Sequence, residues 1–186
     1  MKRRNRHTFC NIVNTMTRKA FAIISILFFL SACTKEDRNN TIVNQEERID
    51  RYITSLGDIK VVRNGGSNRI VYTEGHGADS LAIGDSVSFY YAGYVFSNGK
   101  GALFATNNPQ IAQEKNFPLS GEIENRILSE GNMISGLANG LAGAKEGEKC
   151  DIVFSAEYGF GNTVVYNVPK LTPLIFEVWV EGIVKN

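Results

Sequence analysis

The sequence predicts an α+β fold, in which an antiparallel β-sheet wraps one short helix. Residues 86–96 alternate apolar and polar side chains, as expected of a strand with one buried face. The Asn98-Gly99 pair that follows is a strong signal for a tight hairpin turn, which joins antiparallel strands. Beyond residue 57, helical spacing of apolar side chains is confined to residues 134–141. Many strands around one helix indicate the α+β class.

Length and composition limit the chain to one main domain with extra segments. It has 186 residues, 43% hydrophobic and 21% charged, with a formal net charge of +1, which argues against a nucleic-acid partner. The charge is unevenly placed, because residues 1–32 carry six basic and no acidic side chains. Without them, 14 basic residues face 19 acidic ones. If residues 1–32 are a targeting segment that is removed, the mature chain is therefore acidic.

Residues 1–32 are predicted to be a lipoprotein signal peptide. A basic stretch precedes Ala20–Leu30, an apolar run of eleven residues, whereas a membrane-spanning helix needs about 20. The continuation Leu-Ser-Ala-Cys33 resembles the lipobox of bacterial lipoproteins, whose cysteine is lipidated and becomes the first mature residue. An ordinary signal peptide followed by a chance cysteine is the alternative. Met16 begins a stretch that is a complete short signal peptide by itself, so the sequence does not decide whether translation starts at Met1 or Met16.

Residues 33–43 are predicted to form the lipidated Cys33 and a flexible tether, because residues 34–41 are polar and lack periodicity. Lys35-Glu36-Asp37 resembles the surface-export signal of Bacteroidetes-type lipoproteins, and an ordinary polar linker is the alternative. Several acyl chains, such as palmitate, hold a protein on a membrane where one binds only marginally. We therefore expect a cell-envelope protein anchored to the outer membrane, on its surface or its periplasmic face.

The cysteines exclude an internal disulfide in the mature chain. Cys10 leaves with the signal peptide and Cys33 is consumed by lipid, which leaves Cys150 alone. Because Cys150 lies in a predicted strand, we expect it to be a small buried apolar side chain.

Residues 44–57 are predicted to form an amphipathic helix. Asn44 is the expected N-cap, with Glu47 three residues later as in a capping box, and Gly57 is the expected end. One apolar stripe follows at helical spacing: Ile49, Tyr52, Ile53 and Leu56. So short a helix is marginal alone, so we expect it to pack on its own domain, with a dimer contact as the alternative.

Residues 58–186 are predicted to form the sheet domain. The expected strands are 60–63 and 69–72 around a hairpin loop, then 86–96, 102–106, 149–155 and 172–184. In the last strand Phe176 and Val178 share the inward face, and Trp179 lies on the opposite face. Residues 107–132 are expected to be a long polar connection. The helix marked by Ile134, Leu137 and Leu141 is weakened by glycines.

The chain lacks the residues that most enzymes use for covalent chemistry. It has no phosphate-binding loop, no Gly-x-Ser-x-Gly and no Cys-x-x-Cys. His7 leaves with the signal peptide, and His76 lies in a glycine-rich turn where a solvated loop residue is expected. We therefore expect no metal, no cofactor and an apolar pocket without acid or base. Such a pocket suits binding, or a reaction that breaks no covalent bond.

The order of several segments is similar to one known family. They are residues 69–77 and 84–93, Asn98–Phe104, Met133–Leu137, Glu157–Gly161 and Leu174–Val178. Together they resemble the FKBP-type peptidyl-prolyl cis-trans isomerases over residues 58–184. The resemblance implies a sheet half-wrapped around one helix, with proline bound between them. It implies isomerase activity on proline-containing peptides or unfolded proteins.

The resemblance also implies the site residues. Those implied as catalytic are Tyr91, Phe104, Ile134, Phe160 and Phe176, and those implied as substrate-binding are Met133, Leu137 and Tyr158. Ile134 matches the residue whose backbone N–H donates a hydrogen bond to a ligand carbonyl. Three positions depart from the family pattern. Ala105 stands where the family has a pocket aspartate, and Phe160 stands where it has a tyrosine whose hydroxyl binds the ligand. Leu137 stands where the family has the tryptophan that forms the pocket floor. We therefore expect a weak isomerase, and a non-catalytic peptide- or partner-binding surface lipoprotein is the alternative.

Overall fold

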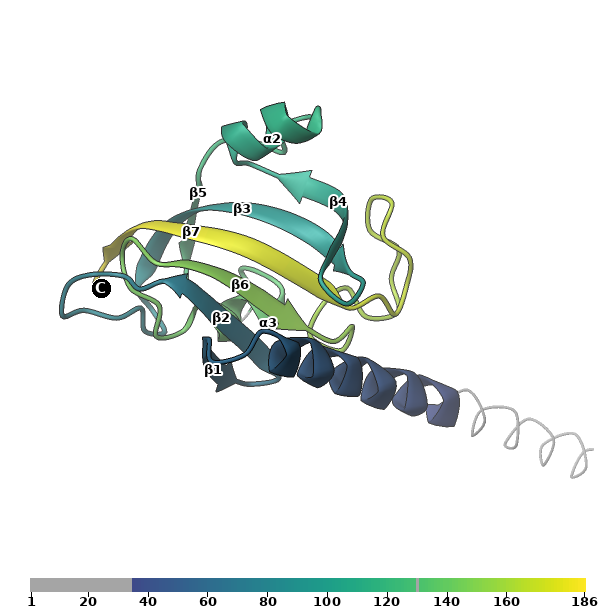
Figure 1. The fold of residues 1–186 in the computed structure, drawn as a ribbon. Coiled ribbons are helices and arrows are strands. Elements are labelled where there is room, and N and C mark those ends of the chain that lie inside the picture. Colours follow the sequence, from purple (N-terminus) through teal and green to yellow (C-terminus); the bar gives the residue numbers. More distant parts are fainter. Residues whose placement is uncertain (1–34, 130) are drawn as a thin grey trace, which may run out of the picture. The chain divides into compact units, whose positions relative to one another are not determined.

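The computed structural model describes residues 35–129 and 131–186 (Figure 1). Cys33 and the predicted signal peptide lie outside these residues. The chain divides into two compact units, Met1–Thr41 and Ile42–Asn186. In the first unit, residues 35–41 are helical. Across the described ranges, no helix is both long and apolar enough to span a membrane.

The second unit is built on one antiparallel sheet (Figure 1). Its strands are β1 (Lys60–Asn64), β2 (Ser67–Thr73), β3 (Ser86–Phe96), β4 (Lys100–Thr106), β5 (Glu124–Ile127), β6 (Lys149–Phe154) and β7 (Leu174–Val184). The order is β1-β2-β6-β7-β3-β4, and β5 pairs with β3. The two long strands β3 and β7 pair from Ser86–Val184 to Val95–Leu174. The predicted fold class is confirmed.

One edge of β3 is shared by two strands, and the sheet divides between them. β4 pairs with the part of β3 from Ala92 onward, whereas β5 pairs with Ser86–Phe89. At the division, the Asn107 side chain accepts a hydrogen bond from the Tyr91 N–H at 2.6 Å. The Asn107 N–H donates to the Tyr91 carbonyl at 3.3 Å. Asn107 thus completes the backbone pairing that β4 and β5 leave open at Tyr91.

One face of the sheet is covered by α3 (Ser135–Leu141). The glycines that weaken this helix as an isolated segment allow it to lie close to β6. A Cβ at Gly136 would lie 2.4 Å from the Phe154 ring, and one at Gly140 would lie 2.2 Å from Ile152. No methyl group fits at such distances. Close packing on the sheet therefore outweighs the low helix propensity of glycine.

The opposite face is covered by residues 42–55 of the N-terminal helix. Ile49 and Ile53 are buried in a second apolar cluster with Val153 and Ile175 of the sheet. Trp179 packs against the same cluster, on the face that the alternation of β7 predicts. The N-terminal helix thus packs on its own domain, and both faces of the sheet are buried.

The N-terminal helix is longer than the sequence predicts. Residues 35–55 are helical, so Asn44 lies inside the helix and is not its N-cap. The expected tether is likewise helical from Lys35 onward. Residues 35–55 contain neither glycine nor proline, and a helix anchored by packing extends readily once formed. The end is as predicted, because helical residues stop at Ser55 and Gly57 adopts a φ of 73°.

The connection of residues 107–132 contains two elements that the sequence does not predict. One is α2 (Pro109–Lys115), whose N-cap Asn108 accepts hydrogen bonds from two backbone N–H groups in the first turn. The other is β5, in which three of the four residues are polar. Elements this short carry too few apolar side chains for periodicity to reveal them.

Cys150 and His76 lie as predicted. Cys150 is a free, fully buried thiol, and burial raises its pKa far above the ordinary thiol range. His76 is exposed in the turn beside Gly147. Burial keeps the Cys150 thiol away from solvent.

Candidate active site

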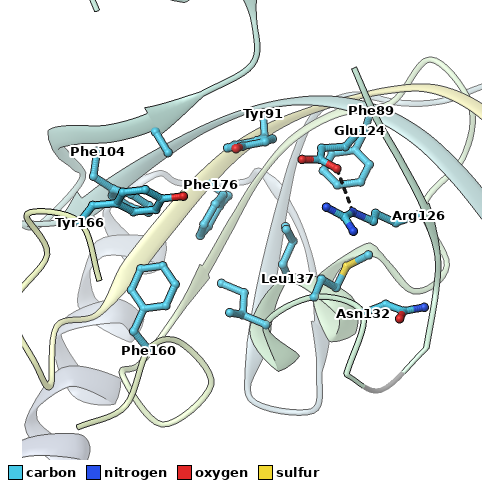
Figure 2. Close-up of a pocket in the computed structure, with 13 residues that line it drawn as sticks. Phe89, Tyr91, Phe104, Glu124, Arg126, Asn132, Leu137, Phe160, Tyr166 and Phe176 are labelled. Carbon is cyan, nitrogen blue, oxygen red and sulfur yellow. Dashed lines mark hydrogen bonds and ion pairs between the residues drawn. The ribbon is translucent and has the colours of Figure 1, made fainter. Parts of the chain in front are cut away.

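A cavity of about 210 Å³ is lined by residues of β3, β4, β5, β7 and α3 and of two loops (Figure 2). Seven of the eight predicted pocket residues line it: Tyr91, Phe104, Met133, Ile134, Leu137, Phe160 and Phe176. These residues come from five separate parts of the sequence, and the fold brings them together. Within residues 35–129 and 131–186, no group of three or more His, Cys, Asp or Glu side chains is placed to hold a metal ion.

Aromatic rings in edge-to-face contact form the wall on the sheet side. The Phe104 ring lies 5.7 Å from that of Phe176 and 5.8 Å from that of Phe160, both nearly perpendicular. The Tyr91 ring lies 6.0 Å from that of Phe176. Gly93 of β3 makes this arrangement possible, because a Cβ there would lie 2.7 Å from Phe104 and 2.9 Å from Phe176. The result is a rigid apolar surface of ring edges and faces.

The opposite wall is the start of α3. Ile134 is the N-cap residue of this helix, and its carbonyl accepts hydrogen bonds from the N–H groups of Leu137 and Ala138. Leu137 is almost fully buried at the cavity wall. The Gly136 N–H donates to the Tyr158 carbonyl at 2.8 Å, which ties the start of α3 to the following loop.

Tyr158 is the exception among the predicted pocket residues. Its side chain does not line the cavity; it lines a separate hollow beside Ser135 and Asn139. Its ring also lies where a Cβ at Gly66 would be, on the β1–β2 turn. The structure therefore does not bring the Tyr158 side chain into the cavity with the other predicted residues. Its backbone carbonyl supports α3, and its ring covers the turn.

The cavity also contains an acid and a base, contrary to the sequence-based expectation. Glu124 and Arg126 of β5 line it and form an ion pair, with 2.8 Å between the Glu124 carboxylate and the Arg126 Nε (Figure 2). Residues i and i+2 of a strand share a face, so both side chains point to the same side. Half of the Arg126 side chain is exposed, and such pairs contribute little to stability.

The ionisation of Tyr91 follows from this setting. Burial raises the pKa of the Tyr91 hydroxyl above its usual range, and the negative charge of Glu124 raises it further. The phenol is therefore protonated at neutral pH. It is a neutral hydrogen-bond donor within an aromatic wall.

Three further cavity residues are not among those that the sequence assigns to the site: Phe89, Asn132 and Tyr166. Phe89 follows from the same strand alternation that places Tyr91 inward. Ala105, at the position where the resemblance implies a pocket aspartate, also lines the cavity. Strict alternation would place it on the face opposite Phe104, but the β3–β4 register shifts between Gly93 and Tyr94, so that both residues face the cavity. Tyr166 belongs to the loop between β6 and β7, has a positive φ of 52° and is 75% exposed. No sequence signal predicts its place beside the cavity.

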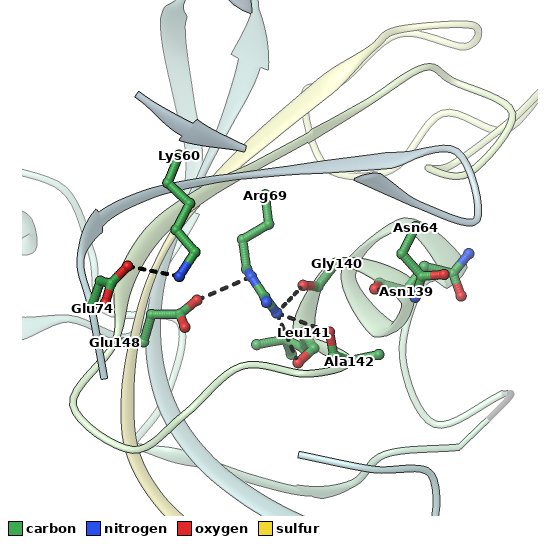
Figure 3. A network of polar contacts seen from close by, with 9 residues as sticks. All are labelled: Lys60, Asn64, Arg69, Glu74, Asn139, Gly140, Leu141, Ala142 and Glu148. Atoms are coloured by element: carbon green, nitrogen blue, oxygen red, sulfur yellow. Dashed lines mark hydrogen bonds and ion pairs between the residues drawn. The ribbon is translucent and has the colours of Figure 1, made fainter. Parts of the chain in front are cut away.

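A buried arginine fixes the end of α3 (Figure 3). Arg69 of β2 donates from Nη1 to the carbonyls of Gly140 at 2.9 Å and Ala142 at 2.9 Å. Its Nε lies 3.0 Å from the Glu148 carboxylate, and both side chains are more than nine-tenths buried. The carbonyls at a helix end lack partners within the helix, and a cation there is favourable. Arg69 therefore holds the helix that supplies Ile134 and Leu137.

The half-wrapped sheet, helix α3 and the aromatic cavity between them define an FKBP-like fold with a largely apolar pocket. Residues 77–181, more than half of the chain, match the family model of the FKBP-type peptidyl-prolyl cis-trans isomerases. The chain belongs to this family, which places it among the prolyl isomerases.

Curated relatives agree with this assignment. FK506-binding protein 1 of Aspergillus oryzae is 31% identical over 113 residues, covering 61% of this chain and 94% of that protein. FK506-binding protein 1A of Neurospora crassa is 30% identical, covering 61% and 84%. FK506-binding protein 5 of Dictyostelium discoideum is 28% identical over 75% of this chain, which spans 8% of that much longer protein.

Solved structures share the fold at lower identity. A peptidyl-prolyl cis-trans isomerase from Pseudomonas syringae superposes with a TM-score of 0.57 at 17% identity, covering 79% of this chain and 96% of that one. The three FKBP domains of wheat FKBP73 give a TM-score of 0.56 at 20% identity, covering 69% and 50%. The fold extends across these distant sequences.

Proposed function

We propose that this chain catalyses the cis-trans isomerisation of X-Pro bonds in proline-containing peptides or unfolded proteins of the cell envelope, with weak activity. The observation that carries the proposal is the cavity itself. In a member of the prolyl isomerase family, seven residues from distant parts of the chain converge on one apolar pocket. Its aromatic rings suit a pyrrolidine ring.

The chemistry requires no nucleophile and no cofactor. An X-Pro bond rotates over a barrier of about 18–20 kcal/mol, because rotation destroys the amide resonance. The twisted amide is less polar than the planar one, so a water-poor cavity favours the transition state. Tyr91, Phe104 and Phe176 would enclose the proline ring. The backbone N–H of Ile134 would donate a hydrogen bond to a substrate carbonyl.

Weak activity is expected because polar contacts to the twisted amide are reduced. Phe160 lacks a hydroxyl, Ala105 lacks a carboxylate and Leu137 offers a smaller floor than tryptophan. One missing hydrogen bond costs about 0.5–1.5 kcal/mol. Glu124 and Arg126 bring charged groups to the cavity wall, but the two groups pair with each other and so do not replace the missing contacts to the substrate.

A protease-coupled assay with a proline peptide tests the proposal. The wild type should speed isomerisation above the uncatalysed rate. Ala105→Phe should abolish this rate because its ring fills the cavity, whereas Ala102→Phe, at an exposed position of the same strand, should leave it unchanged. Circular dichroism checks that both variants are folded. A folded wild type without any rate would contradict the proposal.

The alternative is a non-catalytic module that binds a peptide or partner protein in the same cavity. The three departures and the charged pair on the cavity wall favour it. Calorimetry with the same proline peptide separates the two functions. Binding that Ala105→Phe abolishes, without any catalysed rate in the wild type, would establish the module.

We also propose that the chain is a lipoprotein, anchored to the outer membrane by acyl chains on Cys33. The support is the short apolar run followed by a lipobox-like sequence. In cells labelled with a palmitate analogue, Cys33→Ala should abolish labelling and release the protein from membranes. Cys10→Ala removes a cysteine that leaves with the signal peptide, so it should keep both properties. Labelling of Cys33→Ala would overturn the proposal.

Whether the protein lies on the cell surface or on the periplasmic face of the outer membrane is tested separately. If Lys35-Glu36-Asp37 directs surface export, protease added to intact cells should digest the wild type. A variant with alanine at all three positions should then be shielded. Equal digestion of both proteins would contradict a role for these residues.

A further inference from the structure

We propose that Gln45, in the N-terminal helix, is a positioning residue for the pocket loop, defined here as residues 155–173 between β6 and β7. This loop carries Phe160 and Tyr166 to the cavity. The proposal rests on the proposed isomerase function for its consequence, but the contact itself can be measured independently. Gln45 lies outside residues 77–181, the segment that matches the family model.

Gln45 joins the two ends of the pocket loop. Its side-chain oxygen accepts a hydrogen bond from the Ala156 N–H at 2.8 Å. Its side-chain nitrogen donates to the Leu171 carbonyl at 2.8 Å. Gln45 is only 5% exposed, and Ala156 is fully buried. A side-chain amide here connects two backbone segments as a strand would, using both its donor and its acceptor.

The two residues that Gln45 contacts, Ala156 and Leu171, are also hydrogen-bonded to Gly161, the residue that follows Phe160. The Gly161 N–H donates to the Ala156 carbonyl at 3.0 Å, and the Leu171 N–H donates to the Gly161 carbonyl at 2.7 Å. Gln45 and Gly161 thus hold the same two residues, Ala156 and Leu171, from opposite sides. Because Phe160 is bonded directly to Gly161, this network sets the position of its ring against Phe104.

A neighbouring contact supports the same connection. The Ser155 hydroxyl donates to the Glu46 carboxylate at 2.7 Å, at the start of the pocket loop. Ile49 and Ile53 hold the helix itself to the sheet through apolar packing. The helix is therefore attached by two kinds of contact, apolar to the sheet and polar to the loop. The polar contacts are the ones made with the loop that carries Phe160 to the cavity.

The loss of the Gln45 amide should loosen the pocket loop before the rest of the fold. Ala156 N–H is buried, so removal of its acceptor leaves an unpaired polar group. The loop should then open locally more often, which exposes its amides to exchange. The aromatic wall at Phe160 would lose its fixed position, and orientation of the substrate would suffer.

Amide hydrogen exchange tests the contact without any activity. In Gln45→Ala, the amides of Gly161 and Leu171 should exchange about tenfold faster, while those of β3 and β7 should be unchanged. Gln45→Glu keeps the acceptor for Ala156 but not the donor for Leu171, so it should fall between. Ile49→Val, a mild truncation in the same helix, is the control and should not change these two amides selectively.

The catalytic consequence is measured with the proline peptide at a temperature where all variants are folded. Gln45→Ala should lower kcat/KM about tenfold, and Gln45→Glu less, with Ile49→Val near the wild type. Unchanged exchange at Gly161 and Leu171 would overturn the proposal, as would faster exchange spread evenly over the sheet. Selective loosening with an unchanged rate would overturn the positioning role. A wild type without activity refutes the isomerase function alone, since the exchange result still decides the contact.

Discussion

Arg69→Met should lower the free energy of unfolding by about 3–5 kcal/mol, the cost expected for breaking a buried ion pair from one side. The substitution leaves the Glu148 carboxylate buried without its partner. It also leaves the carbonyls of Gly140 and Ala142 without a donor at the end of α3. The apolar chain of methionine keeps most of the volume, so the loss reports polar contacts and not a cavity.

Urea unfolding monitored by circular dichroism measures this effect. Lys60→Met is the control, because Lys60 of the adjacent strand β1 forms an exposed ion pair with Glu74. Its loss should change the free energy of unfolding only slightly, because exposed ion pairs contribute little. The double variant Arg69→Met/Glu148→Gln no longer buries an unpaired carboxylate, so it should be more stable than Arg69→Met alone. A loss below about 1 kcal/mol for Arg69→Met would contradict the assigned role.

Phe160→Tyr combined with Leu137→Trp should raise kcat/KM for a proline peptide by about tenfold or more. The tyrosine hydroxyl adds a hydrogen bond to the bound substrate, worth about 0.5–1.5 kcal/mol. The tryptophan extends the cavity wall formed by Leu137, so the proline ring gains contact area. The two residues share one cavity, so their effects should not add simply.

The matched control is Phe117→Tyr, which adds a hydroxyl to a phenylalanine that does not line the cavity. It should leave kcat/KM unchanged. Adding Ala105→Asp places a carboxylate at a position that is only 4% exposed, so it should lower stability unless the new tyrosine hydroxyl pairs with it. If the double variant folds and its rate equals that of the wild type, the missing side chains do not limit activity.

The strands of the sheet could be predicted because their side chains alternate. β3 has the predicted bounds, and β7 presents Phe176 and Val178 on one face and Trp179 on the opposite face, as predicted. The connection before α3 could not be predicted, because α2 and β5 are short and largely polar. Helix length also escaped prediction, since the residues before Asn44 have no apolar pattern but continue a helix that packing holds.

The site divides in the same way. Rings on predicted strands, such as Tyr91 and Phe104, occupy the cavity because strand alternation and the family resemblance agree. Glu124 and Arg126 escaped notice because their alternation is visible only once β5 is known to pair with β3. The Tyr158 side chain lies outside the cavity, because a motif position fixes its backbone but not the direction of its side chain. Gln45 could not be found, because its partners lie more than 100 residues away.

Exchange NMR with a proline peptide tests the central claim most directly, because it observes the cis and trans forms and their contacts with the protein. The account predicts exchange cross-peaks that grow when wild-type protein is added, and contacts between the proline ring and the rings of Tyr91, Phe104 and Phe176. Ala105→Phe should remove both effects, and Ala102→Phe should keep them. Catalysed exchange that persists in a folded Ala105→Phe variant, or proline contacts elsewhere on the protein, would contradict the account.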